Sequence, residues 1–194
     1  MPYLSPPTLT ADEQKLILRA TAQHPRDHLI ISMALGTGLR VSELLGLNVG
    51  DVYAPNGTPK IRLRVRAEIA KGRRAGDVFL PDKLAPKLKR FWAVKAKRGE
   101  GLELGDPLFC NQSRRRLSKR RIQHAWHQWQ RAAGFDRIYP FHAIRHSAVT
   151  NVYRATRDLF LAQRFARHVS PLTTVVYTHP SDQEMEDRLR ELAC

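Results

Sequence analysis

One short segment with the period of a β-strand lies within a chain whose other apolar residues mostly follow the period of helices. Ile61, Leu63 and Val65 alternate with arginines, which is the pattern of a strand with one buried face and one basic face. The glycine-containing stretch 71–76 indicates a turn, and residues 77–80 read as the returning strand. One hairpin among helices predicts an α+β fold that is mainly α, with a helical body and a small antiparallel sheet.

Helix start signals occur on both sides of this hairpin. Residues 10–13, Thr-Ala-Asp-Glu, form a capping box, so a helix is expected to begin there and to run to about Gln23. Ser118 can cap a helix that runs to Ala133 and stops before a glycine. Apolar spacing and breaker residues predict the other helices at about 25–36, 41–45, 82–97, 142–155, 158–166, 171–177 and 182–192.

The charge balance restricts the class of partner. The 194 residues include 33 Lys and Arg against 18 Asp and Glu, a formal net charge of +15 with a pI near 10.6. Such an excess favours a polyanionic partner, and nucleic acid over a merely solubilising surface, a ribosomal-type binder or a membrane surface. No apolar run approaches the ~20 residues of a membrane span. Cys110 and Cys194 lack metal-ligand spacing, so we expect no metal site and a reducing, cytoplasmic compartment.

Four residues in the last third of the chain have the chemistry to act on a phosphodiester. His142 and Arg145 are three positions apart and share one helix face, and His168 precedes Tyr177 by nine positions. A tyrosine can attack a phosphate, histidines can move protons, and arginine can hold a phosphate with two parallel hydrogen bonds. Each residue alone also has an ordinary reading, as a core histidine, a surface ion-pair partner or a packed aromatic.

Together these residues resemble the tyrosine recombinase (integrase) family of site-specific DNA strand-exchange enzymes. The resemblance runs from about Leu9 to His179. Arg167 is a departure, because many members have glycine there. The matching segments are the arginine box TGLRVSEL at 37–44, the lysine Lys71 at the family's hairpin position, and His142-Ala143-Ile144-Arg145-His146, Ala166-Arg167-His168 and Tyr177-Thr178-His179.

The resemblance implies the reaction and one group of roles. Tyr177 would attack a backbone phosphate, forming a 3′-phosphotyrosyl link and releasing a 5′-hydroxyl. Arg40 and Arg145 would stabilise the charge on the non-bridging oxygens, for which planar, permanently charged guanidinium groups are well suited. Glu43, one helical turn after Arg40, could orient an arginine or a histidine.

The remaining roles concern protons. The resemblance implies that His142 assists proton transfer at the nucleophile and that His168 holds a non-bridging oxygen. Lys71 would protonate the leaving 5′-oxygen, with Arg73 and Arg74 as neighbouring rivals; a lysine gives up a proton far more readily than an arginine. No metal ion and no cofactor is implied.

Double-stranded DNA is the implied partner, bound by a homotetramer on paired sites, with a monomer possible off DNA. In the cytoplasmic compartment expected above, the location would be nucleoid-associated, with no membrane partner. The basic residues expected along the phosphates are Arg62, Arg64, Arg66, Arg73, Arg74, Arg114, Arg115, Arg116, Lys119, Arg120 and Arg121.

The expected organisation is an extended arm at 1–9, a catalytic domain at 10–180 and a tail helix at 181–194, which docks on a neighbouring protomer or on its own domain. Family members usually carry a further helical DNA-binding domain before the catalytic domain, and no segment here matches it. Two alternative functions stay open, a type IB topoisomerase-like enzyme and a catalytically inactive DNA-binding module.

Overall fold

The computed structural model describes residues 6–177, 189, 190 and 192. The chain divides into two compact units. The larger unit comprises residues 7–148, and the C-terminal unit comprises residues from 149 onward together with residues 1–6. The boundary falls inside helix α7 (His142–Thr156). The predicted α+β, mainly helical class is confirmed, because helices dominate the described residues and two strands form one antiparallel sheet.

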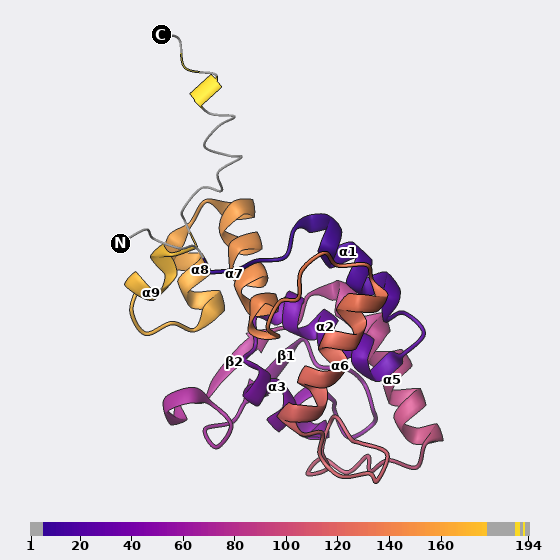
Figure 1. The fold of residues 1–194 in the computed structure, drawn as a ribbon. Coiled ribbons are helices and arrows are strands. Elements are labelled where there is room, and N and C mark those ends of the chain that lie inside the picture. The colour runs from indigo at the N-terminus through magenta and orange to yellow at the C-terminus, as the bar shows by residue number, and fades with distance from the viewer. Residues whose placement is uncertain (1–5, 178–188, 191, 193–194) are drawn as a thin grey trace. The chain divides into compact units, whose positions relative to one another are not determined.

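Helices and one hairpin build the larger unit (Figure 1). Its buried apolar side chains form one continuous core, in which Trp126 is fully buried and donates its indole N–H to the carbonyl of Tyr139 at 2.8 Å. Besides the start of α7, the elements are α1 (Ala11–Ala20), α2 (Pro25–Thr37), α3 (Val41–Gly46), α4 (Val49–Val52), β1 (Arg62–Val65), η1 (Lys71–Arg73), β2 (Gly76–Phe79), η2 (Asp82–Leu84), α5 (Ala85–Lys97) and α6 (Lys119–Ala132).

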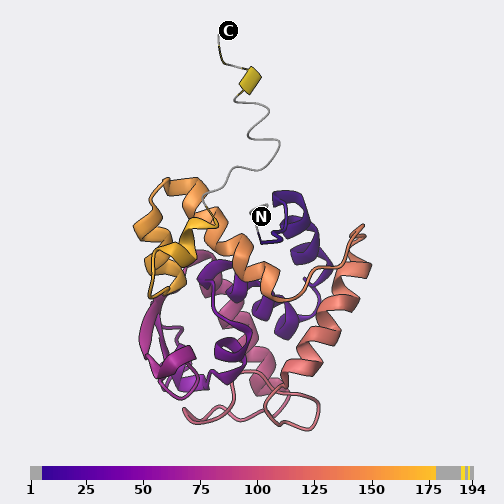
Figure 2. The ribbon, with the colours of Figure 1, turned by 60° about the vertical axis from the view of Figure 1, so that its left-hand side comes forward.

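The hairpin lies at one edge of the larger unit, away from α6 (Figures 1 and 2). Strand β1 pairs antiparallel with β2, from Arg62 opposite Phe79 to Val65 opposite Gly76. Leu63 and Val65 are buried as the alternation predicts. The prediction was wrong for Ile61, which is 79% exposed. It precedes the first residue of β1, although its carbonyl still accepts from the N–H of Leu80 at 2.9 Å.

The two helix caps expected from the sequence are present. The Thr10 hydroxyl accepts from the N–H of Glu13 at 3.1 Å, and the Glu13 carboxylate accepts from the N–H of Thr10 at 2.7 Å. The Ser118 hydroxyl accepts from the N–H of Arg121 at 3.3 Å, at the start of α6. These bonds satisfy donors that a helix cannot pair by itself, and so fix where each helix begins.

The C-terminal unit contains the end of α7, α8 (Leu159–Ala166) and α9 (Leu172–Val175). It has a small core of its own, formed by Val149, Ala162, Ala166 and Tyr177. The predicted tail helix, apart from residues 189, 190 and 192, and most of the predicted arm lie outside the described residues. Within the described part of the chain, no helix is both long and apolar enough to cross a membrane.

Candidate active site

Arg40 is held at the start of α3 by a single carboxylate. Glu43 accepts a hydrogen bond from the backbone N–H of Arg40 at 2.8 Å and another from its guanidinium at 3.1 Å. Glu43 is only 1% exposed, whereas the Arg40 side chain keeps 23% of its surface accessible. The buried carboxylate therefore orients a guanidinium that an anion can still reach.

Arg145 is fixed to the same segment of chain. It lies on α7, is 3% exposed and donates from its guanidinium to the carbonyl of Gly38. Gly38 ends α2 in the left-handed conformation, with φ 61°, and its N–H donates to the carbonyl of Ala34. A glycine suits this turn because it has no Cβ to clash there. The side chains of both predicted phosphate-binding arginines are thus held by hydrogen bonds to residues within 38–43.

His142 opens α7 three residues before Arg145. Its ring meets that of His146 edge to face, with centroids 4.5 Å apart. Partial burial lowers the pKa of His142 below its usual value of 6.5, and the positive charges of Arg145, Arg40, Lys119 and Lys71 lower that pKa further. Five basic groups therefore act on one region of the larger unit, which is the electrostatic arrangement that an anionic phosphate needs.

Lys71 lies in the connection between β1 and β2, residues 66–75, as the sequence predicts. Its loop neighbours Gly72 and Arg73 both have positive φ, at 71° and 53°. Lys71, Arg73 and Arg74 are all exposed, so exposure does not indicate which of them is the proton donor. The charge of Lys71 contributes to the lowered pKa of His142, an electrostatic link between this loop and the arginine site.

His168 and Tyr177 come together within the C-terminal unit. Their rings are stacked, with centroids 6.0 Å apart and planes 19° from parallel. Nδ1 of His168 lies 2.9 Å from the hydroxyl of Thr174, a fully buried residue that no sequence motif singles out. Tyr177 is 6% exposed and belongs to the core of this unit.

Arg167 adopts a conformation that explains why glycine is common at its position in the family. It is the C-cap of α8 and lies in the left-handed region, with φ 53° and ψ 45°. Its N–H donates to the carbonyls of Arg164 and Gln163, and the N–H of His168 also donates to Gln163. This turn redirects the chain immediately before His168.

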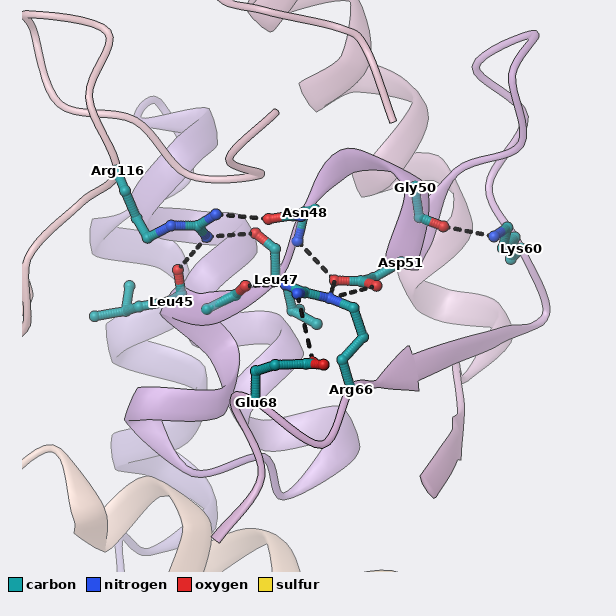
Figure 3. Close-up of polar contacts among 10 residues, drawn as sticks. Leu45, Leu47, Asn48, Gly50, Asp51, Lys60, Arg66, Glu68 and Arg116 are labelled. Carbon is teal, nitrogen blue, oxygen red and sulfur yellow. Dashed lines mark hydrogen bonds and ion pairs between the residues drawn. The ribbon is translucent and has the colours of Figure 1, made fainter. Parts of the chain in front are cut away.

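The predicted DNA-contacting residues separate into two groups. Two of them, Arg66 and Arg116, direct their guanidinium groups to backbone and side-chain oxygens of the protein (Figure 3). Arg116 is exposed despite these bonds. The other nine residues are exposed as well, and among them Arg64 forms an ion pair with Asp77 at 3.0 Å. These nine are Arg62, Arg64, Arg73, Arg74, Arg114, Arg115, Lys119, Arg120 and Arg121.

Comparison with known proteins decides the family. Residues 7–184 match the sequence profile of the phage integrase family. The chain belongs to the phage integrase family. The predicted kinship with tyrosine recombinases is therefore confirmed for nearly the whole chain.

Two kinds of relative illustrate this membership of the phage integrase family. Tyrosine recombinase XerC of Neisseria meningitidis serogroup B is 34% identical over 153 residues, which cover 79% of this chain and 47% of that protein. The crystal structure of XerA recombinase superposes with a TM-score of 0.79 at 26% identity, covering 97% of this chain and 66% of the other. A post-cleavage complex of XerH with its palindromic difH substrate superposes with a TM-score of 0.78, also at 26% identity. The match covers 96% of this chain and 53% of the XerH chain. The chain spans about half the length of the curated relatives it matches.

Proposed function

We propose that this chain cleaves and rejoins DNA strands by transesterification, as the catalytic part of a site-specific recombinase. The observation that carries the proposal is the shared anchoring of Arg40 and Arg145 on residues 38–43. Two guanidinium groups fixed by one segment suit a phosphorane, whose two non-bridging oxygens gain charge as it forms. Residues 10–180 form the proposed catalytic domain.

Tyr177 is the proposed nucleophile. Its phenolic oxygen attacks the phosphorus, the bond from phosphorus to the 5′-oxygen breaks, and a 3′-phosphotyrosyl link remains. His142 takes the phenolic proton, and Lys71 gives a proton to the leaving 5′-oxygen. A 5′-hydroxyl from a partner strand then reverses these steps and restores a continuous strand.

His168 is the proposed donor to a non-bridging oxygen. If its Nδ1 accepts from the Thr174 hydroxyl, the ring carries its proton on Nε2 and can donate from there. Thr174 would then select the tautomer that the reaction needs. Loss of Arg40 or of Arg145 should cost on the order of 10²–10³ in rate, as for other donors that stabilise a developing charge.

Double-stranded DNA is the proposed substrate, with the nine exposed basic residues named above along its phosphates. The net charge of +15 supports this, and the XerH structure shows a relative bound to its DNA site. The active form is proposed to be a homotetramer on paired sites, in which the segment 181–194 docks on a neighbouring protomer.

A suicide substrate, nicked beside the target phosphate, tests the function. The wild-type chain should form a protein–DNA adduct that survives a denaturing gel, and should then exchange strands between two duplexes. An inactive binding module would shift the DNA on a native gel without any adduct. A topoisomerase would form the adduct and relax supercoils but would not exchange strands.

A further inference from the structure

Arg116 binds the end of α3, the helix that Arg40 begins. Its guanidinium donates to the carbonyls of Leu45 at 2.9 Å and Leu47 at 2.8 Å, and to the side-chain oxygen of Asn48 at 2.5 Å (Figure 3). The last carbonyls of a helix have no partner within that helix. Arg116 therefore provides the C-terminal cap of α3 from a loop about seventy residues later in the chain.

Arg66 binds the same region from the hairpin side. Its Nε lies 3.1 and 3.0 Å from the two oxygens of Asp51, and its Nη2 donates to the carbonyl of Gly46 at 2.8 Å. Asp51 is 6% exposed and also accepts from the N–H of Asn48 at 2.7 Å. Arg66 is the first residue after β1, so it ties the base of the Lys71 loop to α3 and α4 (Figure 3).

Close packing adds a second contact between the Lys71 loop and α3. A Cβ placed on Gly46 would lie 2.5 Å from Cγ2 and 2.9 Å from Cβ of Ile69. No side chain fits between these two segments. The loop that carries Lys71 is thus held against one end of α3, and Arg40 is held at the other end.

We propose that Arg66 and Arg116 are positioning residues of the cleavage reaction, and that they do not bind DNA phosphates. Arg116 holds α3 and hence Arg40, while Arg66 holds the loop and hence Lys71. This inference rests on the proposed function. It accounts for arginine at both positions, because a planar fork of donors reaches several fixed acceptors at once and an ammonium group does not.

Lysine substitutions separate this role from phosphate binding. Arg66→Lys and Arg116→Lys keep the charge, so a phosphate contact would be preserved. If Arg66 and Arg116 are positioning residues, each lysine variant should instead form the adduct slowly. Its first-order rate at saturating DNA should be about tenfold below the wild-type rate. DNA affinity should stay within about twofold of wild type. The control is Lys60→Gln, which removes a 2.5 Å bond to the carbonyl of Gly50 on α4 and should leave the rate unchanged.

A substrate with sulfur in place of the bridging 5′-oxygen distinguishes the two arginines. Sulfur leaves without needing a proton, so a displaced Lys71 no longer matters. The Arg66→Lys defect should therefore be largely rescued by this substrate. The Arg116→Lys defect should persist, because Arg40 acts on the non-bridging oxygens. A general loss of folding would not be rescued, and thermal unfolding of each variant checks for it.

Gly46→Ala provides an independent variant without any change of charge. Its methyl group should push Ile69 and the Lys71 loop outward, giving a rate loss that sulfur again rescues. Wild-type rates in both lysine variants, or defects in Arg66→Lys and Gly46→Ala that sulfur leaves untouched, would overturn the inference. Absence of any adduct with the wild-type chain would instead overturn the proposed function itself.

Discussion

The carboxylate of Glu43 binds both the backbone N–H and the guanidinium of Arg40, at 2.8 and 3.1 Å. Glu43→Gln keeps the shape of the side chain but removes the charge that strengthens both bonds. A charge-assisted bond is worth roughly 1.5–3 kcal/mol, so adduct formation at saturating DNA should slow at least about tenfold. Single-turnover cleavage on the suicide substrate measures this.

Glu103→Gln is the matched control for that change, since Glu103 is an exposed carboxylate in the loop after α5. Its cleavage rate should equal that of the wild type. Equal rates for Glu43→Gln and Glu103→Gln would show that the buried carboxylate does not orient Arg40 for catalysis.

The parts of the fold that depend on nearby residues could be predicted from the sequence. The Thr10 capping box, the Ser118 cap and the burial of Leu63 and Val65 are confirmed, because a cap joins residues three apart and a strand alternates with period two. The family resemblance supplied the site residues, whose catalytic roles remain predictions.

The contacts that individual arginine side chains make could not be predicted in this way. Arg64 and Arg66 are alike in the alternating pattern, yet Arg64 is exposed and pairs with Asp77 on the neighbouring strand, whereas Arg66 turns to Asp51 and Gly46. The acceptors of Arg116 lie about seventy residues earlier in the chain. Such partners are set by tertiary structure, which periodicity does not contain. Thr174 was missed although it lies only six residues after His168, because a spacing of six follows neither helix nor strand periodicity.

Thr174→Val tests whether the hydroxyl selects the tautomer of His168. Valine keeps the volume and removes the 2.9 Å contact with Nδ1. A net hydrogen bond of about 1 kcal/mol corresponds to an approximately fivefold slower cleavage at saturating DNA. Thr174→Ser, which restores a hydroxyl, should recover most of the rate. If serine and valine cleave equally slowly, the defect comes from packing and Thr174 has no role in orienting the ring.

The lowered pKa of His142 predicts a titration below the ordinary histidine range. With the pKa below 6.5, the ring loses its proton at a lower pH than usual, so more than half of it is neutral and ready to accept a proton at pH 6.5. A proton NMR titration of the protein should place the His142 midpoint under 6.5. Lys119→Gln removes one of the positive charges responsible and should raise the midpoint. A midpoint above 6.5 in the wild type would contradict this assignment.

Arg167→Gly should stabilise the C-terminal unit. The residue has φ 53°, a conformation that costs a side chain about 1 kcal/mol and costs glycine little. Denaturant unfolding should therefore show a gain of up to about 1 kcal/mol. Arg164→Gly, inside α8, should lose about 1 kcal/mol as glycine does in other helices. A loss of stability for Arg167→Gly would mean that contacts of the arginine side chain outweigh the backbone strain.

The phenolic oxygen of Tyr177 is the proposed attacking group, and one denaturing gel tests it most directly. Wild-type protein and Tyr177→Phe are incubated with the same end-labelled nicked duplex, after native gels have shown equal DNA binding. The wild type should give a labelled band that protease digestion removes, and Tyr177→Phe should give none. An adduct that persists in Tyr177→Phe, or its absence from the wild type on DNA that the protein binds, would contradict the proposed reaction.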